Sequence, residues 1–192
     1  MTDSLKEQKK ALRRQIALLK KQHQTEAGQQ SVAIMTALEA HPVFQAAHTV
    51  LLYHSLPDEV CTHTFIRTWS ATKKILLPVV AGEELELRLY TGPQDLTIGS
   101  YGILEPVGKT ISSYTDIDLI VVPGVAFDYH GYRLGRGKGY YDRLLPHLPQ
   151  AYKLGICFPY QLLPHLPAES FDIAMDEVLT IQPASSTLPE AK

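Results

Sequence analysis

The first quarter of the chain carries its apolar residues at helical spacing, in a background of charged and polar positions. The repeating residues are Leu5, Leu12, Ile16 and Leu19. Ser4 and Glu7 form a capping-box pattern ahead of this repeat, so a first helix is predicted over residues 4–23. A second helix is predicted from a cap at Thr25 to about His41, because a proline follows and disfavours helix in the residue before it.

From residue 48 onward, short apolar and β-branched runs alternate with helical segments. The pattern predicts strands over 48–53, 74–80, 84–90, 118–122, 152–158 and 177–181, and helices over 62–72 and 139–147. Strands interleaved with helices favour an α/β fold, a three-layer arrangement in which a mostly parallel sheet has helices on both faces. We expect a single domain over residues 1–182 and a frayed tail over 183–192.

One short segment carries most of the candidate chemistry. Residues 131–142 read Gly-Tyr-Arg-Leu-Gly-Arg-Gly-Lys-Gly-Tyr-Tyr-Asp, in which glycines alternate with Arg136 and Lys138. Glycine lets backbone N–H groups approach a ligand closely, and a helix beginning just after the glycines adds its positive N-terminal end. The segment follows the strand predicted over 118–122, and ligands of such sheets gather at the carboxyl ends of strands. We interpret it as a cradle for a nucleotide polyphosphate.

This cradle differs from two well-known phosphate motifs. A Walker A loop needs a glycine where Tyr132 stands and Ser or Thr where Gly139 stands. The dinucleotide-binding pattern fails because its third glycine comes one residue early. The alternative interpretation of the segment is a glycine-rich surface turn with incidental basic residues.

A second candidate feature is the pair Lys9 and Arg13, which lie four residues apart and share a face of the first predicted helix. Like charges at this spacing repel by roughly a few tenths of a kcal/mol, and an anion bound between them would explain the pair. A solvated basic face explains the spacing equally well.

Composition narrows the classes of function. The chain of 192 residues has a net charge of −2, which argues against bulk electrostatic binding to nucleic acid or a membrane. Its two cysteines, Cys61 and Cys157, are expected to be reduced thiols. The N-terminus is predicted to be a charged helix without the apolar core of a signal peptide, and both features indicate a cytoplasmic protein. The eight histidines form no zinc motif. We expect no obligate protein partner.

The order of several motifs resembles the 5-formyltetrahydrofolate cyclo-ligase family, also called methenyltetrahydrofolate synthetase, over about residues 6–181. The most specific part runs from Val122-Pro123-Gly124 through Phe127-Asp128 to the segment 133–142. Supporting pieces lie at 9–13 (Lys-Lys-Ala-Leu-Arg), 57–60 (Pro-Asp-Glu-Val), 101–106 (Tyr-Gly-Ile-Leu-Glu-Pro), 171–173 (Phe-Asp-Ile) and 176–178 (Asp-Glu-Val).

The resemblance implies a reaction that consumes ATP with Mg²⁺ and converts 5-formyltetrahydrofolate to 5,10-methenyltetrahydrofolate, ADP and phosphate. Phosphoryl transfer to the formyl oxygen would create a leaving group, and N10 of the folate would then attack the activated carbon. The protein's task in such chemistry is mainly orientation and charge stabilisation.

By their match to the family motifs, particular residues would carry these tasks. The expected ATP-binding residues are Lys9, Arg13, Arg133, Gly135, Arg136, Gly137, Lys138, Gly139 and Tyr141. Arg136, Lys138 and Tyr140 would be catalytic, and the folate would contact His54, Glu59, Tyr101 and Tyr140. Asp142 and Asp172 would hold Mg²⁺, directly or through water.

Some of these assignments have alternatives. His54 stands where relatives often carry an apolar residue, Tyr101 is equally well explained as a core or rim aromatic, and Asp142 as an acid that stabilises a helix N-terminus. Cys61 and Phe171 stand where relatives commonly carry an acid and a histidine. At the level of function, a small-molecule kinase or a non-catalytic nucleotide sensor would use the same cradle.

Overall fold

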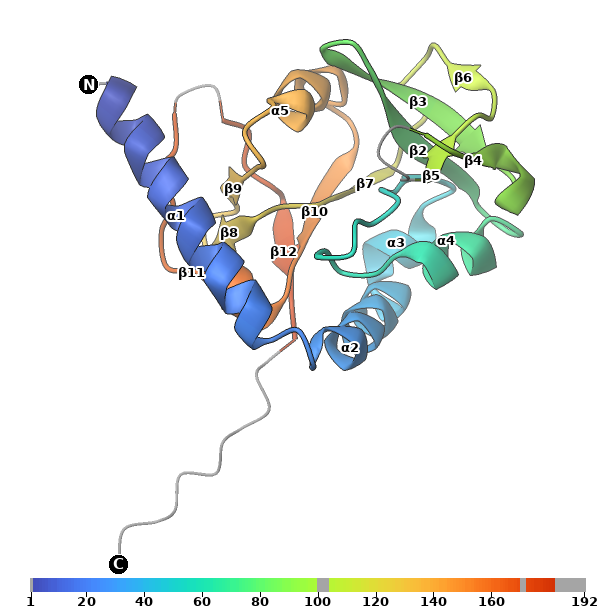
Figure 1. Ribbon diagram of the computed structural model, residues 1–192. Helices are drawn as coiled ribbons and strands as arrows, with labels where there is room; N and C mark the ends of the chain where they lie inside the picture. The colour runs from blue at the N-terminus through green and yellow to red at the C-terminus, as the bar shows by residue number, and fades with distance from the viewer. Residues whose placement is uncertain (1, 100–103, 170–171, 182–192) are drawn as a thin grey trace, which may run out of the picture.

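The computed structural model describes residues 2–99, 104–169 and 172–181 (Figure 1). Its α-helices are α1 (Thr2–Gln22), α2 (Ala27–Ala40), α3 (Pro42–Ala46), α4 (His63–Trp69) and α5 (Tyr140–Leu144). Single 3₁₀ turns lie at Pro93–Asp95, Leu145–His147 and Pro159–Gln161. No helix of these described ranges is long and apolar enough to cross a membrane.

A seven-stranded sheet forms the centre of the molecule, in the order β12-β10-β7-β1-β2-β3-β6. Its strands are β1 (Thr49–Leu51), β2 (Lys74–Ala81), β3 (Glu84–Tyr90), β6 (Thr110–Ile111), β7 (Leu119–Val122), β10 (Tyr152–Ile156) and β12 (Glu177–Leu179). Pairing is parallel from β12 to β2 and antiparallel from β2 through β3 to β6. The predicted mostly parallel α/β sheet is confirmed.

Successive side chains along the buried strands belong alternately to two hydrophobic cores, one on each face of the sheet. On β1, Val50 belongs to the core beneath α2, α3 and α4, whereas its neighbour Leu51 belongs to the core beneath α5. Leu76 on β2 joins the second core, and Ile75 and Leu77 join the first. Because successive strand residues point to opposite faces, continuous apolar runs can serve a sheet that is covered on both sides.

The first helix covers a different surface. Its Leu12, Ile16 and Leu19 pack against a three-stranded sheet of β8 (Ala126–Asp128), β9 (Arg133–Leu134) and β11 (Leu162–Leu163). A third sheet pairs β4 (Leu96–Ile98) with β5 (Leu104–Pro106). The small three-stranded sheet matters for the site, because β9 leads directly into the glycine-rich segment.

Most predicted elements are present, and the errors are mainly at their ends. Ser4 lies inside α1, which begins at Thr2, and Glu26 rather than Thr25 precedes α2, so both predicted caps are wrong. The predicted stop near His41 is confirmed, but a short helix begins immediately at Pro42. Proline suits the first turn of a helix, and the His41 ring accepts a hydrogen bond from the Val43 N–H. The proposed boundary at residue 182 stays a prediction, because it lies at the edge of the described residues.

The two cysteines are free and lie in different surroundings. Cys157 follows β10 in the core beneath α5, where burial raises the pKa of its thiol to about 12. Cys61 is exposed just before α4, and its N–H donates to Ser31 Oγ.

Gly155 on β10 gives a test of packing between the central sheet and β8. A Cβ at this position would lie 2.5 Å from the Phe127 ring, which is fully buried. Gly155→Ala should therefore lower the free energy of unfolding by about 1–3 kcal/mol, as overpacked cores do, measured by urea denaturation. The control is Gly28→Ala in α2, where a Cβ meets nothing within 4 Å. That change should stabilise the protein by up to about 1 kcal/mol, since glycine disfavours helix, and equal effects of the two substitutions would contradict this packing.

Candidate active site

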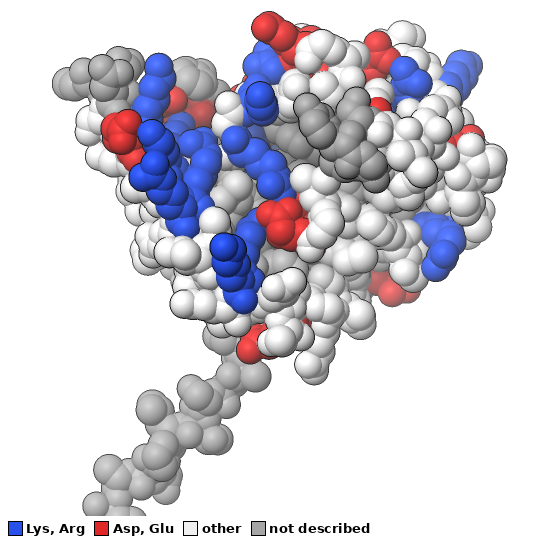
Figure 2. Space-filling model, in the orientation of Figure 1, with Lys and Arg blue, Asp and Glu red and all other residues white. Residues whose placement is uncertain are grey.

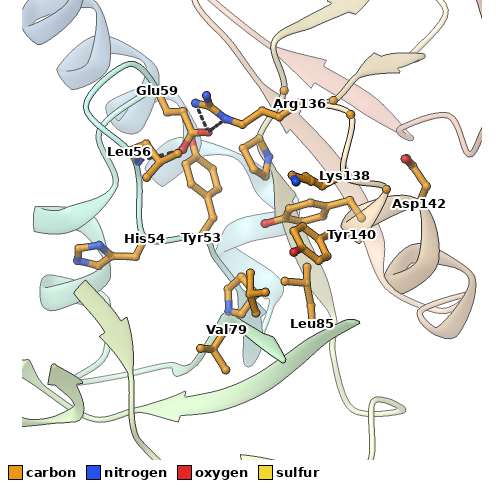
Figure 3. A pocket seen from close by; sticks show the side chains of 18 of the residues that line it. Tyr53, His54, Leu56, Glu59, Val79, Leu85, Arg136, Lys138, Tyr140 and Asp142 are labelled. Carbon is orange, nitrogen blue, oxygen red and sulfur yellow. Dashed lines mark hydrogen bonds and ion pairs between the residues drawn. The ribbon is translucent and has the colours of Figure 1, made fainter. Parts of the chain in front are cut away.

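A cavity of about 320 Å³ opens where β1 and β7 end. The segment after β1 supplies Tyr53, His54, Leu56 and Glu59, and the segment after β7 supplies Pro123 and Gly124. The end of β2 and the start of β3 supply an apolar wall of Pro78, Val79, Val80 and Leu85, continued by residues 104–106. The opposite wall consists of Arg133 and residues 135–142 (Figure 3). The site therefore lies at the carboxyl ends of parallel strands, as the position of the motif predicts.

The glycine-rich wall depends on two left-handed backbone positions. Gly137 has φ of 92° and Gly139 has φ of 72°, values that residues with a Cβ rarely adopt. Gly139 is also the cap of α5, so the chain turns from the loop into the helix at this residue. The turn lets Lys138 and Tyr140, on either side of Gly139, both line the cavity.

Arg133 and Asp142 fix the two ends of this loop to each other. Arg133 Nη2 donates to Asp142 Oδ1 at 2.5 Å, and its guanidinium lies 5.4 Å from the centre of the Tyr141 ring. The Arg133 side chain is only 7% exposed, whereas that of Asp142 is 41% exposed and lines the cavity. Burial and, after it, the negative charge of Glu59 raise the pKa of Tyr141, so its hydroxyl keeps its proton at neutral pH. The wall thus presents a carboxylate and a phenol to the cavity.

Arg136 bridges the glycine loop to the segment after β1. Its Nη2 donates to Asp58 Oδ1 at 2.6 Å and to Glu59 Oε1 at 2.9 Å, and Figure 3 shows Arg136 and Glu59 reaching toward each other at the cavity rim. Burial alone would lower the pKa of the Arg136 guanidinium, but the hydrogen bonds that it donates to Asp58 and Glu59, together with their negative charge, outweigh burial and raise the pKa. Asp58 also accepts from Lys20 at 2.7 Å. Burial alone would raise the pKa of Asp58, and the two cations lower it instead.

Glu59 is held rigidly within the cavity wall. Its Oε2 accepts from the Leu56 N–H at 3.0 Å while Oε1 accepts from Arg136, and the side chain is 10% exposed. A carboxylate oxygen accepts more than one hydrogen bond, so Glu59 retains capacity for a ligand N–H.

His54 lies at the other end of the cavity from the loop (Figure 3). Its ring stacks on that of His63, with ring centres 4.0 Å apart. The Nε2 atom of His63 is 2.9 Å from the Ser55 carbonyl oxygen. Burial lowers the pKa of His54 to about 4, and the neighbouring His63 adds to the effect. At neutral pH His54 therefore presents an uncharged ring to the cavity.

Lys9 and Arg13 lie beside the loop but are not among the residues that line the cavity. Arg13 Nε donates to the Gly135 carbonyl at 2.8 Å, and Lys9 Nζ pairs with Asp172 at 3.0 Å and with Glu169 at 3.1 Å. Burial alone would lower the pKa of Lys9, but these two acids outweigh it and raise the pKa. Both cations thus have specific partners and are not simply solvated. Figure 2 shows Lys and Arg side chains gathered along α1 and over the adjoining centre of the same face.

The two predicted metal ligands are paired with different cations, Asp142 with Arg133 and Asp172 with Lys9. Within the described ranges, no three His, Cys, Asp or Glu side chains cluster closely enough to form a protein-only metal site. Mg²⁺ typically binds to one or two carboxylates and to substrate phosphates, keeping several waters. The exposed Asp142 carboxylate at the cavity fits that mode, and Asp172, bound by Lys9 and the Glu169 N–H, requires its partners to move.

The cavity brings together most of the residues singled out from sequence. His54, Glu59, Arg133, Tyr140, Tyr141, Asp142 and every residue from 135 to 139 line it, whereas Lys9, Arg13 and Asp172 lie outside its lining. Tyr101 and Phe171 lie outside the described residues. Sequence reasoning missed the apolar wall from β2 and β3, since nothing in those strands distinguishes a cavity wall from a core. It also missed Asp58, although that residue adjoins Glu59.

The cavity combines a basic glycine loop with Glu59 and an apolar wall at the carboxyl ends of an α/β sheet. A pocket of this composition is typical of an enzyme and suits an anionic group beside an apolar one. Residues 5–181 match the model of the 5-formyltetrahydrofolate cyclo-ligase family, and the chain belongs to that family.

Individual relatives agree with this assignment. The 5-formyltetrahydrofolate cyclo-ligase of Escherichia coli K12 is 34% identical over 179 residues, which cover 88% of this chain and 96% of that protein. A probable 5-formyltetrahydrofolate cyclo-ligase of Schizosaccharomyces pombe is 33% identical over 79% of this chain and 83% of its own length. The solution structure of Aquifex aeolicus 5,10-methenyltetrahydrofolate synthetase is 36% identical with a TM-score of 0.80, covering 90% and 89% of the two chains. A solved structure of a 5,10-methenyltetrahydrofolate synthetase from Mycoplasma pneumoniae is 25% identical with a TM-score of 0.71, covering 90% of this chain and 98% of that chain.

The lowered pKa of His54 makes a prediction about stability in mild acid. Between about pH 6.5 and pH 4 the unfolded chain binds a proton at His54 that the folded protein does not, so the free energy of unfolding falls as the pH is lowered. His54→Gln should make this fall shallower, measured by urea denaturation from pH 7.5 to 4.5. The substitution His48→Gln is the control for loss of an exposed histidine that lies outside the cavity lining. Parallel profiles of the parent and His54→Gln proteins would contradict the assignment.

Proposed function

We propose that this protein converts 5-formyltetrahydrofolate to 5,10-methenyltetrahydrofolate, with cleavage of ATP to ADP and phosphate. The observation that carries the proposal is a single cavity in which the cationic loop at 135–139 faces Glu59 and an apolar wall. This arrangement suits a phosphate donor and a flat, partly apolar acceptor side by side. Membership of the cyclo-ligase family supports the same reaction.

The difficulty of the reaction explains why both ligands must meet in one cavity. A formamide carbonyl is a poor electrophile, and its oxygen is a poor leaving group. Transfer of the γ-phosphoryl group to the formyl oxygen breaks the bond to ADP and gives an imidate phosphate. Attack of N10 on the formyl carbon, loss of the N10 proton to solvent and departure of phosphate then close the methenyl bridge. The protein contributes orientation and stabilisation of the phosphoryl charge.

The phosphate side of the site is assigned to the loop and its cations. Arg133, Arg136, Lys138 and the glycine N–H groups would surround the triphosphate, with Arg136 and Lys138 stabilising the transferring group. Arg136 is bound to Asp58 and Glu59, so contact with phosphate exchanges these carboxylates for phosphate oxygens. Lys9 and Arg13 would approach the phosphates from α1, since Arg13 already contacts the loop at Gly135. Tyr141 would contribute through its stacking on Arg133.

The folate side is assigned to the opposite part of the cavity. Glu59, fixed by the Leu56 N–H, would accept hydrogen bonds from the N–H edge of the pterin. Tyr140 would pack against the folate, and His54 would contact it as a neutral ring. The wall of Val79, Val80 and Leu85 offers apolar surface to the flat ring system. Tyr101 stays a prediction from the family resemblance.

For magnesium, Asp142 has the better placed carboxylate, with Asp172 as the second candidate ligand. The bound ion would neutralise phosphate charge next to the loop. Each of these acids is paired with a cation that we assign to phosphate, Arg133 and Lys9 respectively. A magnesium–nucleotide complex therefore offers both members of each pair a partner of the opposite charge.

Other parts of the assignment stay predictions. We propose a cytoplasmic location, a single catalytic domain over residues 1–182 and activity without an obligate protein partner. Fractionation of cells that make the tagged chain tests the location. Sedimentation of the purified protein during turnover tests whether it acts without a protein partner.

The reaction is tested by incubating the purified protein with ATP, Mg²⁺ and 5-formyltetrahydrofolate and following the methenyl absorbance band. Free phosphate should appear with one equivalent of product, and chelation of Mg²⁺ should stop the reaction. A stable phosphorylated product would indicate a small-molecule kinase instead. ATP binding without turnover of folate would indicate a nucleotide sensor.

Lys138→Ala should lower kcat roughly 10²-fold while the protein remains folded. Lys138 lies at the cavity wall between Gly137 and Gly139, both of which have positive φ. Removal of one charge that stabilises a transition state typically lowers kcat by about this factor. Turnover by the methenyl assay and the thermal midpoint together measure the effect. The exposed Lys21→Ala is the control for loss of a lysine charge. A folded Lys138→Ala protein with normal kcat would refute the role.

The double variant Lys9→Gln, Arg13→Gln should lower ATP affinity at least about tenfold, because a hydrogen bond to a charged group contributes about 1.5–3 kcal/mol. Folate affinity measured without ATP should change little. Lys10→Gln, Arg14→Gln is a matched control, since both residues are exposed on the same helix at the same spacing. If both double variants bind ATP as the parent does, α1 is only a scaffold for the loop. Calorimetric titration of ATP makes the comparison.

A further inference from the structure

Arg143, one residue beyond the glycine-rich motif, joins two parts of the molecule that are distant in sequence. Its Nε donates to the Glu83 carbonyl at 2.9 Å, and its Nη2 donates to the same oxygen and to the Lys138 carbonyl at 3.1 Å. The guanidinium carbon also lies 5.5 Å from the centre of the Tyr140 ring. One side chain thus contacts the turn between β2 and β3, the backbone of the loop and an aromatic residue of the cavity.

These contacts connect opposite walls of the cavity. Glu83 lies in the turn between β2 and β3, whose flanking residues Val80 and Leu85 form part of the apolar wall. Lys138 and Tyr140 belong to the phosphate wall. Arg143 itself is not among the residues that line the cavity, so it acts on the site through the backbone and the ring that it holds.

The local backbone leaves room for this guanidinium. Gly139 has φ of 72°, and a Cβ on it would lie 2.6 Å from Arg143 Nη1. The Arg143 N–H also donates to the Gly139 carbonyl at 3.0 Å, which ties the first turn of α5 to the loop. A planar guanidinium can donate in several directions and stack on an aromatic ring at the same time, which a lysine ammonium cannot reproduce.

A simpler explanation is that Arg143 only forms a surface ion pair with Glu84. Their closest atoms are 3.4 Å apart, and the two side chains are 39% and 60% exposed. Exposed pairs of this kind contribute little. The contacts with Glu83 and Lys138 go to backbone carbonyls and do not depend on the Glu84 charge, so the two explanations are separable by substitution.

We propose that Arg143 is a positioning residue that sets the distance between the phosphate wall and the apolar wall, and thereby the alignment of Lys138 and Tyr140 with the reacting groups. The inference rests on the proposed function for its catalytic consequence. Misplacement of reacting groups by about 1 Å costs on the order of 10²-fold in rate, so loss of the connection should affect kcat more than the affinity for folate.

The experiment compares Arg143→Ala, Arg143→Lys and Glu84→Gln with the parent protein. Arg143→Ala should lower kcat at least about tenfold, with a change of less than about threefold in KM for 5-formyltetrahydrofolate. Arg143→Lys should recover part of the loss, because an ammonium can still donate to carbonyls. Glu84→Gln should match the parent. A kcat for Arg143→Ala within twofold of the parent, or an equal loss in Glu84→Gln, would overturn the proposal.

Hydrogen exchange of the ligand-free proteins gives a readout that does not depend on turnover. Amides of 80–86 and of 137–143 should exchange faster together in Arg143→Ala, whereas α2, far from the contact, should be unchanged. Unaltered exchange in both segments would refute the connection between the walls. If the parent protein fails to convert 5-formyltetrahydrofolate, the proposed function fails, while exchange still decides whether Arg143 joins the two walls.

Discussion

Pairing of opposite charges around the glycine-rich loop is the constraint on which the site depends. Arg133, Arg136 and Lys9 each bond to carboxylates, and the partners come from α5, from the segment after β1 and from the segment before β12. Cations gathered around one loop would repel one another if the carboxylates were absent. The pairs therefore hold the loop in shape without a ligand, and under the proposed function phosphate groups would replace the carboxylates as partners of the same cations.

The central sheet determines where these charges meet. Strands β1 and β7 lie side by side and are buried on both faces, so their carboxyl ends are fixed relative to each other. The segment after β1 carries Glu59, and the chain after β7 passes through β8 and β9 into the loop. α1 packs on the small sheet that contains β9 and reaches the loop through Arg13. The strands and α1 thus hold the loops on both sides of the cavity in fixed positions.

Sequence reasoning predicted the elements with strong patterns and missed those that depend on distant contacts. The alternation over 84–90 gave β3 with its observed ends, and the run at 74–80 gave β2 to within one residue. Three short strands, β8, β9 and β11, are two or three residues long, and they form because they pair with one another and pack against α1. Segments of this length are too short to show a hydrophobic periodicity in the sequence. In the site, the dense motif at 131–142 was sufficient to place the loop. The pairing of Lys9 with Asp172, and of Arg143 with Glu83, joins residues whose proximity no local pattern encodes.

The unequal surroundings of the two cysteines have a practical consequence for observing the enzyme at work. The thiol of Cys157 is buried with a pKa of about 12, so almost none of it is thiolate near neutral pH. Cys61 is exposed two residues after Glu59, on the segment that Arg136 holds across the cavity rim. A maleimide dye added to the folded protein is therefore expected to attach at Cys61. Its emission would report the movement of that segment that the proposed binding of nucleotide by Arg136 implies.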